Sequence, residues 1–217
     1  MGKFAKSPLT FWQRSEMRLR IISGEFGGRF IKTPDSKFTR PTTDKVKQSV
    51  FNYLANFFDF EDAIAADIYS GSGSLGFEML SRGAEKVHFV EKNFPVVKIL
   101  TENIQSLDVE KRVKLHKMKA VTFTATTNLQ FDFIFADPPF YEYDIYEVVK
   151  NIRKRELLKP GGIFMLERSI QTLEDDKINM EMEPIKRLGD TCLYQILNET
   201  SMGSDSISEI PETESEN

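Results

Sequence analysis

Cysteine, histidine and long apolar runs are scarce in this chain of 217 residues. Cys192 is its only cysteine, so no internal disulfide can form, which suits a reducing cytoplasm. The two histidines, His88 and His116, lie far from it in sequence, so we expect no metal site. No apolar run approaches the roughly 18–20 residues of a membrane span, and no secretory signal opens the chain. We therefore expect a cytoplasmic protein that does not contact a membrane.

Positive charge is missing from the end of the chain, where residues 198–217 carry six acidic side chains and no lysine or arginine. Such a polar segment cannot bury a core, so we expect a disordered acidic tail. The opposite bias holds at the other end, where residues 1–47 carry eleven basic and four acidic side chains. A basic end favours a polyanionic partner, although a solvated basic face fits the same numbers.

Apolar periodicity predicts strands that alternate with helices from residue 61 to 197. The expected strands are 63–69, 87–91, 113–115, 131–136 and 163–167, and the expected helices begin at 77, 96 and 143. Two further β-prone segments, 180–188 and 192–197, have no helix between them, so one edge strand should run antiparallel. This order predicts an α/β fold with a doubly wound, mostly parallel, seven-stranded sheet.

The N-terminal part has a different pattern. Residues 1–16 are polar and unpatterned, and we expect them to be disordered. Residues 19–22 and 29–33 are β-prone and flank a glycine-rich turn, which predicts a hairpin. A helix should follow from Pro41-Thr42-Thr43-Asp44, with Val50, Leu54 and Phe57 on its apolar face. Residues 17–60 are therefore a hairpin and helix that precede the sheet.

A glycine-rich motif connects the first core strand to its helix. Gly71-Ser72-Gly73-Ser74-Leu75-Gly76 is a G-x-G-x-x-G, whose glycines let the backbone turn tightly and approach a ligand. Glu91 follows twenty residues after Gly71, at the end of the next strand, where an acid can accept hydrogen bonds from ribose hydroxyls. The arrangement predicts a nucleotide site, whereas a lone glycine-rich loop would indicate much less.

The nucleotide can be a dinucleotide or S-adenosylmethionine. A dinucleotide uses the helix N-terminus for its pyrophosphate, but S-adenosylmethionine has no phosphate and brings a sulfonium and an ammonium group. Asp67 lies four residues before Gly71, at the end of a buried strand, where a carboxylate is costly unless it has a partner. This acid favours S-adenosylmethionine.

The fourth strand, 131–136, ends in Asp137-Pro138-Pro139-Phe140. The prolines stiffen the backbone, so an acid and an aromatic ring are presented at the carboxyl end of a strand, where open α/β sheets bind ligands. Asp137 and the Pro138 carbonyl can accept hydrogen bonds from an exocyclic amine and aim its lone pair at a methyl donor. Phe140 offers a face on which an unstacked base can lie. Asp137 either accepts the departing proton or only orients the amine.

The acid bears on which base is bound. Guanine presents two adjacent donors, N1–H and N2–H, to a carboxylate that can only accept. Adenine presents a donor and an acceptor, which an asparagine amide matches better. Asp137 therefore favours guanine N2 over adenine N6.

At this point the chain resembles a known family, the bacterial 16S (small-subunit) ribosomal RNA guanine-N2 methyltransferases, from Arg18 to about Leu197. The glycine motif and Asp137 to Phe140 fit many amino-methyltransferases, so the specific part is the N-terminal one. The segments that carry the resemblance are Arg20-Ile21-Ile22-Ser23-Gly24, Arg40-Pro41-Thr42-Thr43-Asp44, 67–78, Ser81-Arg82-Gly83-Ala84, Val90-Glu91 and Asp137-Pro138-Pro139-Phe140.

The resemblance implies a class I, Rossmann-like methyltransferase domain at 61–197 with S-adenosylmethionine as cofactor. It implies that the target base is held by Asp137, Pro138, Pro139 and Phe140. It implies a cofactor site made of Asp67, Tyr69, Ser70, Gly71, Ser72, Gly73, Glu91, Lys92, Ala120 and Asp137. It further implies that segment 17–60 contacts ribosomal RNA, naked or in an assembling small subunit, through Arg20, Arg29, Arg40, Thr42 and Lys45.

The chain departs from the family pattern at one position, and other functions also fit part of its sequence. Lys119 occupies the position where such families place an acid or amide for the adenine amino group. The other amino-methyltransferase functions are transfer to adenine N6 or to a protein side-chain amide. A nicotinamide-dependent oxidoreductase would share the glycine motif but lacks a recognisable hydride-transfer constellation. A non-catalytic RNA-binding module would share the basic hairpin but need not keep Asp137 to Phe140.

Overall fold

The computed structural model describes residues 18–34, 44–139 and 142–199, without the side chains of residues 44–46. The predicted extension 1–16 and nearly all of the predicted tail lie outside these residues, as do Arg40, Thr42 and Phe140. Within the described part of the chain, no helix is long and apolar enough to cross a membrane.

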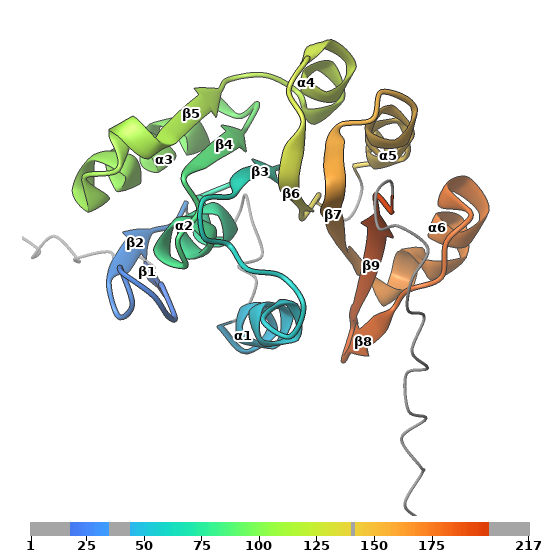
Figure 1. Cartoon of the computed structure of the whole chain (residues 1–217), viewed down its shortest axis with the longest axis horizontal. Coiled ribbons are helices and arrows are strands. Elements are labelled where there is room, and N and C mark those ends of the chain that lie inside the picture. Colours follow the sequence, from blue (N-terminus) through green and yellow to red (C-terminus); the bar gives the residue numbers. More distant parts are fainter. Residues whose placement is uncertain (1–17, 35–43, 140–141, 200–217) are drawn as a thin grey trace, which may run out of the picture.

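A seven-stranded, mostly parallel sheet forms the centre of the molecule, as predicted (Figure 1). The strand order is β5-β4-β3-β6-β7-β9-β8, and β9 runs antiparallel to both of its neighbours. The strands are β3 (Ile64–Ile68), β4 (Lys86–Val90), β5 (Val113–His116), β6 (Phe131–Ala136), β7 (Leu158–Ser169), β8 (Lys186–Leu188) and β9 (Thr191–Leu197). Because β3 leads outward to β4 and the chain later returns to β6, the order reverses between β3 and β6. Open α/β sheets bind ligands at the carboxyl edge beside such a switch point.

Helices cover both faces of this sheet (Figure 1). Those of one face are α1 (Asp44–Leu54), α2 (Ser74–Ser81) and α3 (Phe94–Leu107), and those of the other are α4 (Ala120–Thr126), α5 (Ile145–Lys154) and α6 (Leu173–Met180). Strand β6 serves both cores, since Phe133 and Phe135 pack toward α1 and α2 while Ile134 and Ala136 pack toward α4 and α5. Burial on both faces explains its continuous apolar sequence.

The predicted hairpin consists of β1 (Arg18–Arg20) and β2 (Phe30–Lys32), which pair antiparallel. Its inner residues Ile21, Phe26 and Ile31 belong to the same core cluster as α2 and α3. Hydrogen bonds from the hairpin backbone to side chains hold it there. Phe26 N donates to Ser81 Oγ at 2.9 Å, and Lys32 N donates to Asn103 Oδ1 at 2.9 Å. The hairpin is therefore part of the same body as the sheet.

Several elements differ from the sequence expectation. Helices α4 and α6 were not predicted, because α4 is short and threonine-rich and α6 has few apolar residues. Helix α1 ends at Leu54, and Phe57, expected on its buried face, is 47% exposed. Val50 and Leu54 are buried as predicted, and Lys47, which was not expected on this face, is also 0% exposed.

Candidate functional site

The loop after β3 turns the chain tightly into α2. Tyr69, Gly71 and Gly73 have positive φ angles of 64°, 53° and 87°. A Cβ on Gly73 would come within 2.6 Å of the Leu100 and Phe77 side chains, so only glycine fits there. A Cβ on Gly71 would find, beyond its chain neighbours, only the Tyr69 carbonyl oxygen at 4.0 Å. Gly71 therefore borders open space that a ligand can approach closely.

Glu91, directly after β4, contacts this loop. Its Oε2 accepts a hydrogen bond from Gly71 N at 3.0 Å, and its Oε1 accepts one from Asn93 N at 2.7 Å. The contact follows from the parallel pairing of β3 with β4, which sets Ile68 opposite Val90. Because each carboxylate oxygen has a second lone pair, Glu91 can also accept from a ribose hydroxyl placed beside Gly71.

The two serines of the loop fix its backbone. Ser70 Oγ donates to the Val90 carbonyl at 3.2 Å, and the Ser70 carbonyl accepts from Gly73 N at 2.7 Å. The Ser72 carbonyl accepts from Asn103 Nδ2 at 3.0 Å. These bonds shape the loop before any ligand binds.

Asp67 lies within β3 beneath the loop and is 1% exposed. Its Oδ2 accepts a hydrogen bond from Gly76 N at 2.9 Å. Burial, together with the negative charges of Asp137 and Glu91, raises the pKa of Asp67 from 3.8 to about 8, although the hydrogen bond from Gly76 opposes this shift. Three acids therefore influence one another at this edge, and a cationic ligand would relieve their repulsion. In the part of the chain that is described, no three His, Cys, Asp or Glu side chains are placed to hold a metal ion.

Asp137 follows β6 directly, on the other side of β3 from Glu91. Strands β6 and β3 pair in parallel with Ala136 opposite Ile68, so Asp137 and the glycine loop leave the sheet side by side. Pro138 is buried and Pro139 exposed, and the Pro139 carbonyl accepts a hydrogen bond from Glu142 N at 2.9 Å. The carboxylate is thus presented on a stiff backbone next to the ligand-accessible loop.

Two side-chain contacts tie the segment after Pro139 to neighbouring strands. Tyr69 Oη donates to Asp144 Oδ1 at 2.6 Å, just before α5. Burial and this carboxylate raise the pKa of the Tyr69 phenol well above its usual range, so it remains a donor. Lys92, after β4, forms an ion pair with Glu142. Both Tyr69 and Lys92, predicted to contact the cofactor, therefore make protein contacts around the site.

Ala120 is the first residue of α4 and is 3% exposed, within the core cluster of that face. A cofactor contact there would involve its backbone N–H, because the side chain is buried in the core. Lys119, the residue before it, is exposed.

The predicted RNA contacts do not share one environment. Arg20 is exposed on the outer face of the hairpin, cross-strand from Phe30, which is 59% exposed. The Arg29 guanidinium instead donates to the carbonyls of Ser106 and Leu107 at the end of α3. Lys45 lies in α1, but its side chain is outside the described residues.

A buried ion pair between Lys47 and Glu78, which was not predicted from the sequence, joins the hairpin to α1 and α2. Lys47 Nζ, on α1, donates to the Arg20 carbonyl at 2.7 Å and to Ser74 Oγ at 3.1 Å, and lies 3.9 Å from Glu78 Oε2. Glu78 also accepts from Ile22 N at 2.8 Å. The only available signal was a charged residue on an otherwise apolar helix face, in α1 and again in α2.

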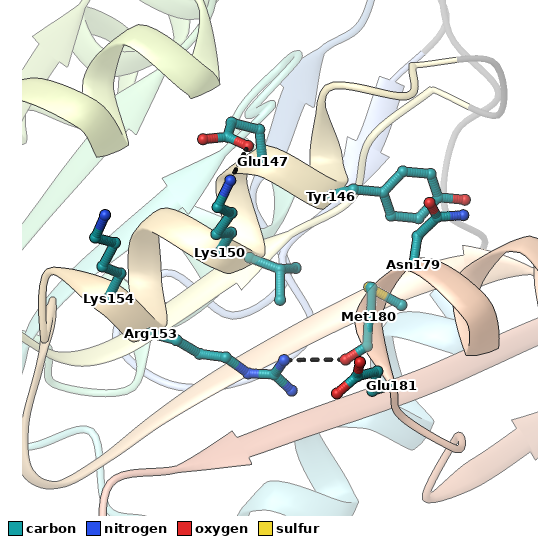
Figure 2. A pocket seen from close by; sticks show the side chains of 9 residues that line it. Tyr146, Glu147, Lys150, Arg153, Lys154, Asn179, Met180 and Glu181 are labelled. Atoms are coloured by element: carbon teal, nitrogen blue, oxygen red, sulfur yellow. Dashed lines mark hydrogen bonds and ion pairs between the residues drawn. The ribbon is translucent and has the colours of Figure 1, made fainter.

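A groove of about 560 Å³ lies elsewhere, between α5 and α6 (Figure 2). Figure 2 shows Lys150, Arg153 and Lys154 projecting from α5 along it, with Arg153 donating to the Met180 carbonyl at 2.9 Å. Among the residues whose side chains the structure describes, none of those predicted for the cofactor, base or RNA lines this groove.

Comparison with known proteins identifies one matching family and several proteins of similar sequence. The family described as conserved hypothetical protein 95 matches residues 19–196. The Bacillus subtilis protein YlbH is 34% identical over 152 residues, which are 69% of this chain and 82% of that protein. Ribosomal RNA small subunit methyltransferase D of Haemophilus influenzae is also 34% identical over 152 residues, covering 69% and 78% of the two chains.

A solved structure has the same fold over most of the chain. The Escherichia coli protein yhhF superposes with a TM-score of 0.72 at 26% identity, covering 85% of this chain and 100% of the other.

Proposed function

The chain belongs to the family described as conserved hypothetical protein 95, and from this membership we propose that it transfers a methyl group from S-adenosylmethionine to the exocyclic N2 of a guanine in small-subunit ribosomal RNA. It is a ribosomal RNA methyltransferase, as its relatives' names indicate. Domain 61–197 holds the cofactor and the base, and segment 17–60 contacts the RNA.

One observation carries the proposal. The glycine loop, Glu91 and Asp137 leave three adjacent strands, β3, β4 and β6, at the same edge of the sheet. Glu91 is bonded to the loop, and Asp137 and Glu91 both raise the pKa of buried Asp67. Such an acidic edge, beside an open glycine corner, suits a nucleoside that carries positive charge.

The cofactor side consists of Asp67, Glu91 and the loop from Tyr69 to Gly73. S-adenosylmethionine supplies, when bound, an electrophilic methyl group on a positively charged sulfur. Gly71 lets the ligand approach the backbone closely, and Glu91 accepts hydrogen bonds from ribose hydroxyls. Asp67 supplies negative charge to the cationic part once that cation, when bound, favours its ionised form. Lys92 and Ala120 border the same site, Ala120 through its backbone.

The acceptor side consists of Asp137, Pro138 and Pro139, with Phe140 after them. Asp137 and the Pro138 carbonyl accept hydrogen bonds from the amine, which localises the nitrogen lone pair and aims it at the methyl carbon. Bound S-adenosylmethionine would give up its methyl group to N2 and would leave as a neutral thioether, because the electron pair of the broken C–S bond stays on sulfur. N2 would then lose one proton, which Asp137 would accept.

The test is a reconstituted reaction. Purified protein, labelled S-adenosylmethionine and small-subunit RNA from cells that lack the protein are combined, with the RNA offered both naked and as the assembled subunit. Mass spectrometry of the nucleosides should find new N2-methylguanosine. Methyl groups on adenine N6 or on protein would instead support the other amino-methyltransferase functions, and no transfer would support a binding module.

A further inference from the structure

Glu167 is a buried acid that the proposed mechanism does not use. It is the third residue from the end of β7 (Leu158–Ser169) and is 8% exposed. The preceding residues Ile163 and Met165 pack in the core cluster that includes Phe133 and Phe135 of β6. Because strand side chains alternate, Glu167 projects to the same face of the sheet as Met165.

The pairing of β6 with β7 sets Glu167 beside Asp137. The two strands are parallel, with Phe135 opposite Met165 and Ala136 opposite Leu166. Continued by one residue, this register places Asp137 opposite Glu167, and neighbouring strands lie about 4.8 Å apart. Since Asp137 follows Phe135 by two residues, both carboxylates occupy the same face. On its other side, Glu167 pairs with Leu193, which is fully buried.

The strand order decides which reactant Glu167 faces. The glycine loop follows β3, Asp137 follows β6, and Glu167 ends β7, in the order β3-β6-β7. Asp137 therefore stands between the methyl donor's loop and Glu167. A carboxylate on the far side of Asp137 lies where the acceptor base must sit.

A buried network holds this end of β7 in place. Arg168, whose side chain is 1% exposed, donates through Nε to Asp176 Oδ1 at 3.1 Å. Asp176 also accepts from Thr172 Oγ1 at 2.7 Å and from Tyr146 Oη at 3.0 Å. Because Arg168 is anchored on the opposite face, the adjacent Glu167 is presented on a rigid strand end.

We propose that Glu167 is a specificity residue. Its carboxylate accepts a hydrogen bond from N1–H of the target guanine, while Asp137 accepts one from the N2 amine. The proposal rests on the proposed function. Guanine is the base that offers two adjacent donors, and two neighbouring carboxylates, which only accept, complement that edge. Adenine would direct its N1 lone pair at Glu167 and be rejected, since a buried acceptor facing an acceptor loses its hydrogen bond.

The test changes both partners of the proposed hydrogen bond, the base in the RNA and the side chain of Glu167. A synthetic RNA carries either guanine or 2-aminopurine at the position that the wild type methylates. 2-Aminopurine keeps the 2-amino group but has an acceptor at N1. Wild type should prefer guanine, whereas Glu167→Gln, whose amide can donate, should shift the guanine to 2-aminopurine rate ratio by about tenfold or more toward 2-aminopurine.

The controls separate binding, folding and the parent hypothesis. Glu147→Gln, the same change at a half-exposed side chain of α5, should leave the ratio unchanged. Affinity for S-adenosylhomocysteine should be the same in wild type and Glu167→Gln. An unshifted ratio, or a loss of S-adenosylhomocysteine affinity, would overturn the role of Glu167. Failure of the proposed function shows differently, as no methylation of the guanine RNA by the wild type.

Discussion

At the scale of single residues, the proposed chemistry depends on Asp137. Replacing it by alanine removes the acceptor that aims the amine but leaves the glycine loop and Glu91 untouched. Methyl transfer should fall by about two orders of magnitude or more, while S-adenosylhomocysteine binds with nearly wild-type affinity. Transfer assays and isothermal titration measure the two effects. Asp175→Ala, at an exposed position of α6, is the matched control. Normal turnover of Asp137→Ala would refute its role.

Asp67 predicts a pH dependence of stability. Its pKa is about 8 in the folded protein against 3.8 for a free carboxyl, so between these pH values the folded state keeps a proton that the unfolded chain has lost. The carboxyl's contribution to the free energy of unfolding therefore falls as pH rises from about 4 to about 8, and stays low above that. A bound cation would oppose the shift by favouring the charged form.

Asp67→Asn should remove this dependence, because the amide stays neutral and its oxygen can still accept from Gly76 N. Without ligand, the variant should match the wild type only below about pH 4 and should gain stability relative to it as pH rises to about 8, by at least about 1 kcal/mol in total. Denaturant titrations at several pH values measure this difference. Parallel curves for the two proteins would show that Asp67 is ionised throughout.

The hairpin is the element that we propose contacts RNA, and its two arginines should behave differently. Arg20→Ala removes an exposed charge, so RNA affinity and the salt dependence of binding should fall, by about one unit in the log–log slope, with stability unchanged. Arg29→Ala removes a cap on the last carbonyls of α3 and should lower stability by about 1 kcal/mol. Equal salt slopes for Arg20→Ala and wild type would mean that the outer face of the hairpin is only solvated.

Helix α2 depends on Glu78, which is 0% exposed and binds the hairpin backbone, Arg82 and Lys47. Glu78→Ala leaves Lys47 buried without its carboxylate and should lower the free energy of unfolding by about 3–5 kcal/mol. Chemical denaturation checks this loss, with Glu85→Ala, an exposed position of the following loop, as control. Similar small losses in both variants would contradict the importance of the buried pair.

At the scale of the whole molecule, Asn198 is the last residue that we expect folding to require. Asn198 N donates to the Gly162 carbonyl at 3.0 Å, and Asn198 Nδ2 donates to the Leu158 carbonyl at 2.8 Å. Deleting residues 199–217 preserves both bonds, so the melting temperature and methyl-transfer rate should stay unchanged. A large loss of either would mean that the acidic tail contributes to folding or catalysis.

Local patterns made most of the fold predictable. Strand β6 matches the expected 131–136, because burial on both faces leaves an apolar run, and Glu91 lies at the end of β4, as the predicted strand indicated. The hydrogen bond from the glycine loop to Glu91 was not predicted. Helix α6 was missed because only two of its eight residues are buried. The expected proximity of Glu167 to Asp137 follows from the pairing of β6 with β7. Strand order is set by long-range packing, and no local pattern in β7 encodes it.

The most direct measurement is mass spectrometry of small-subunit ribosomal RNA from cells that lack this protein. One N2-methylguanosine should be missing, and it should return when the wild-type chain is supplied but not when Asp137→Ala is supplied. An unchanged set of methylated guanines, or the loss of a methyl group from adenine instead, would contradict the assignment of this chain as a guanine-N2 methyltransferase.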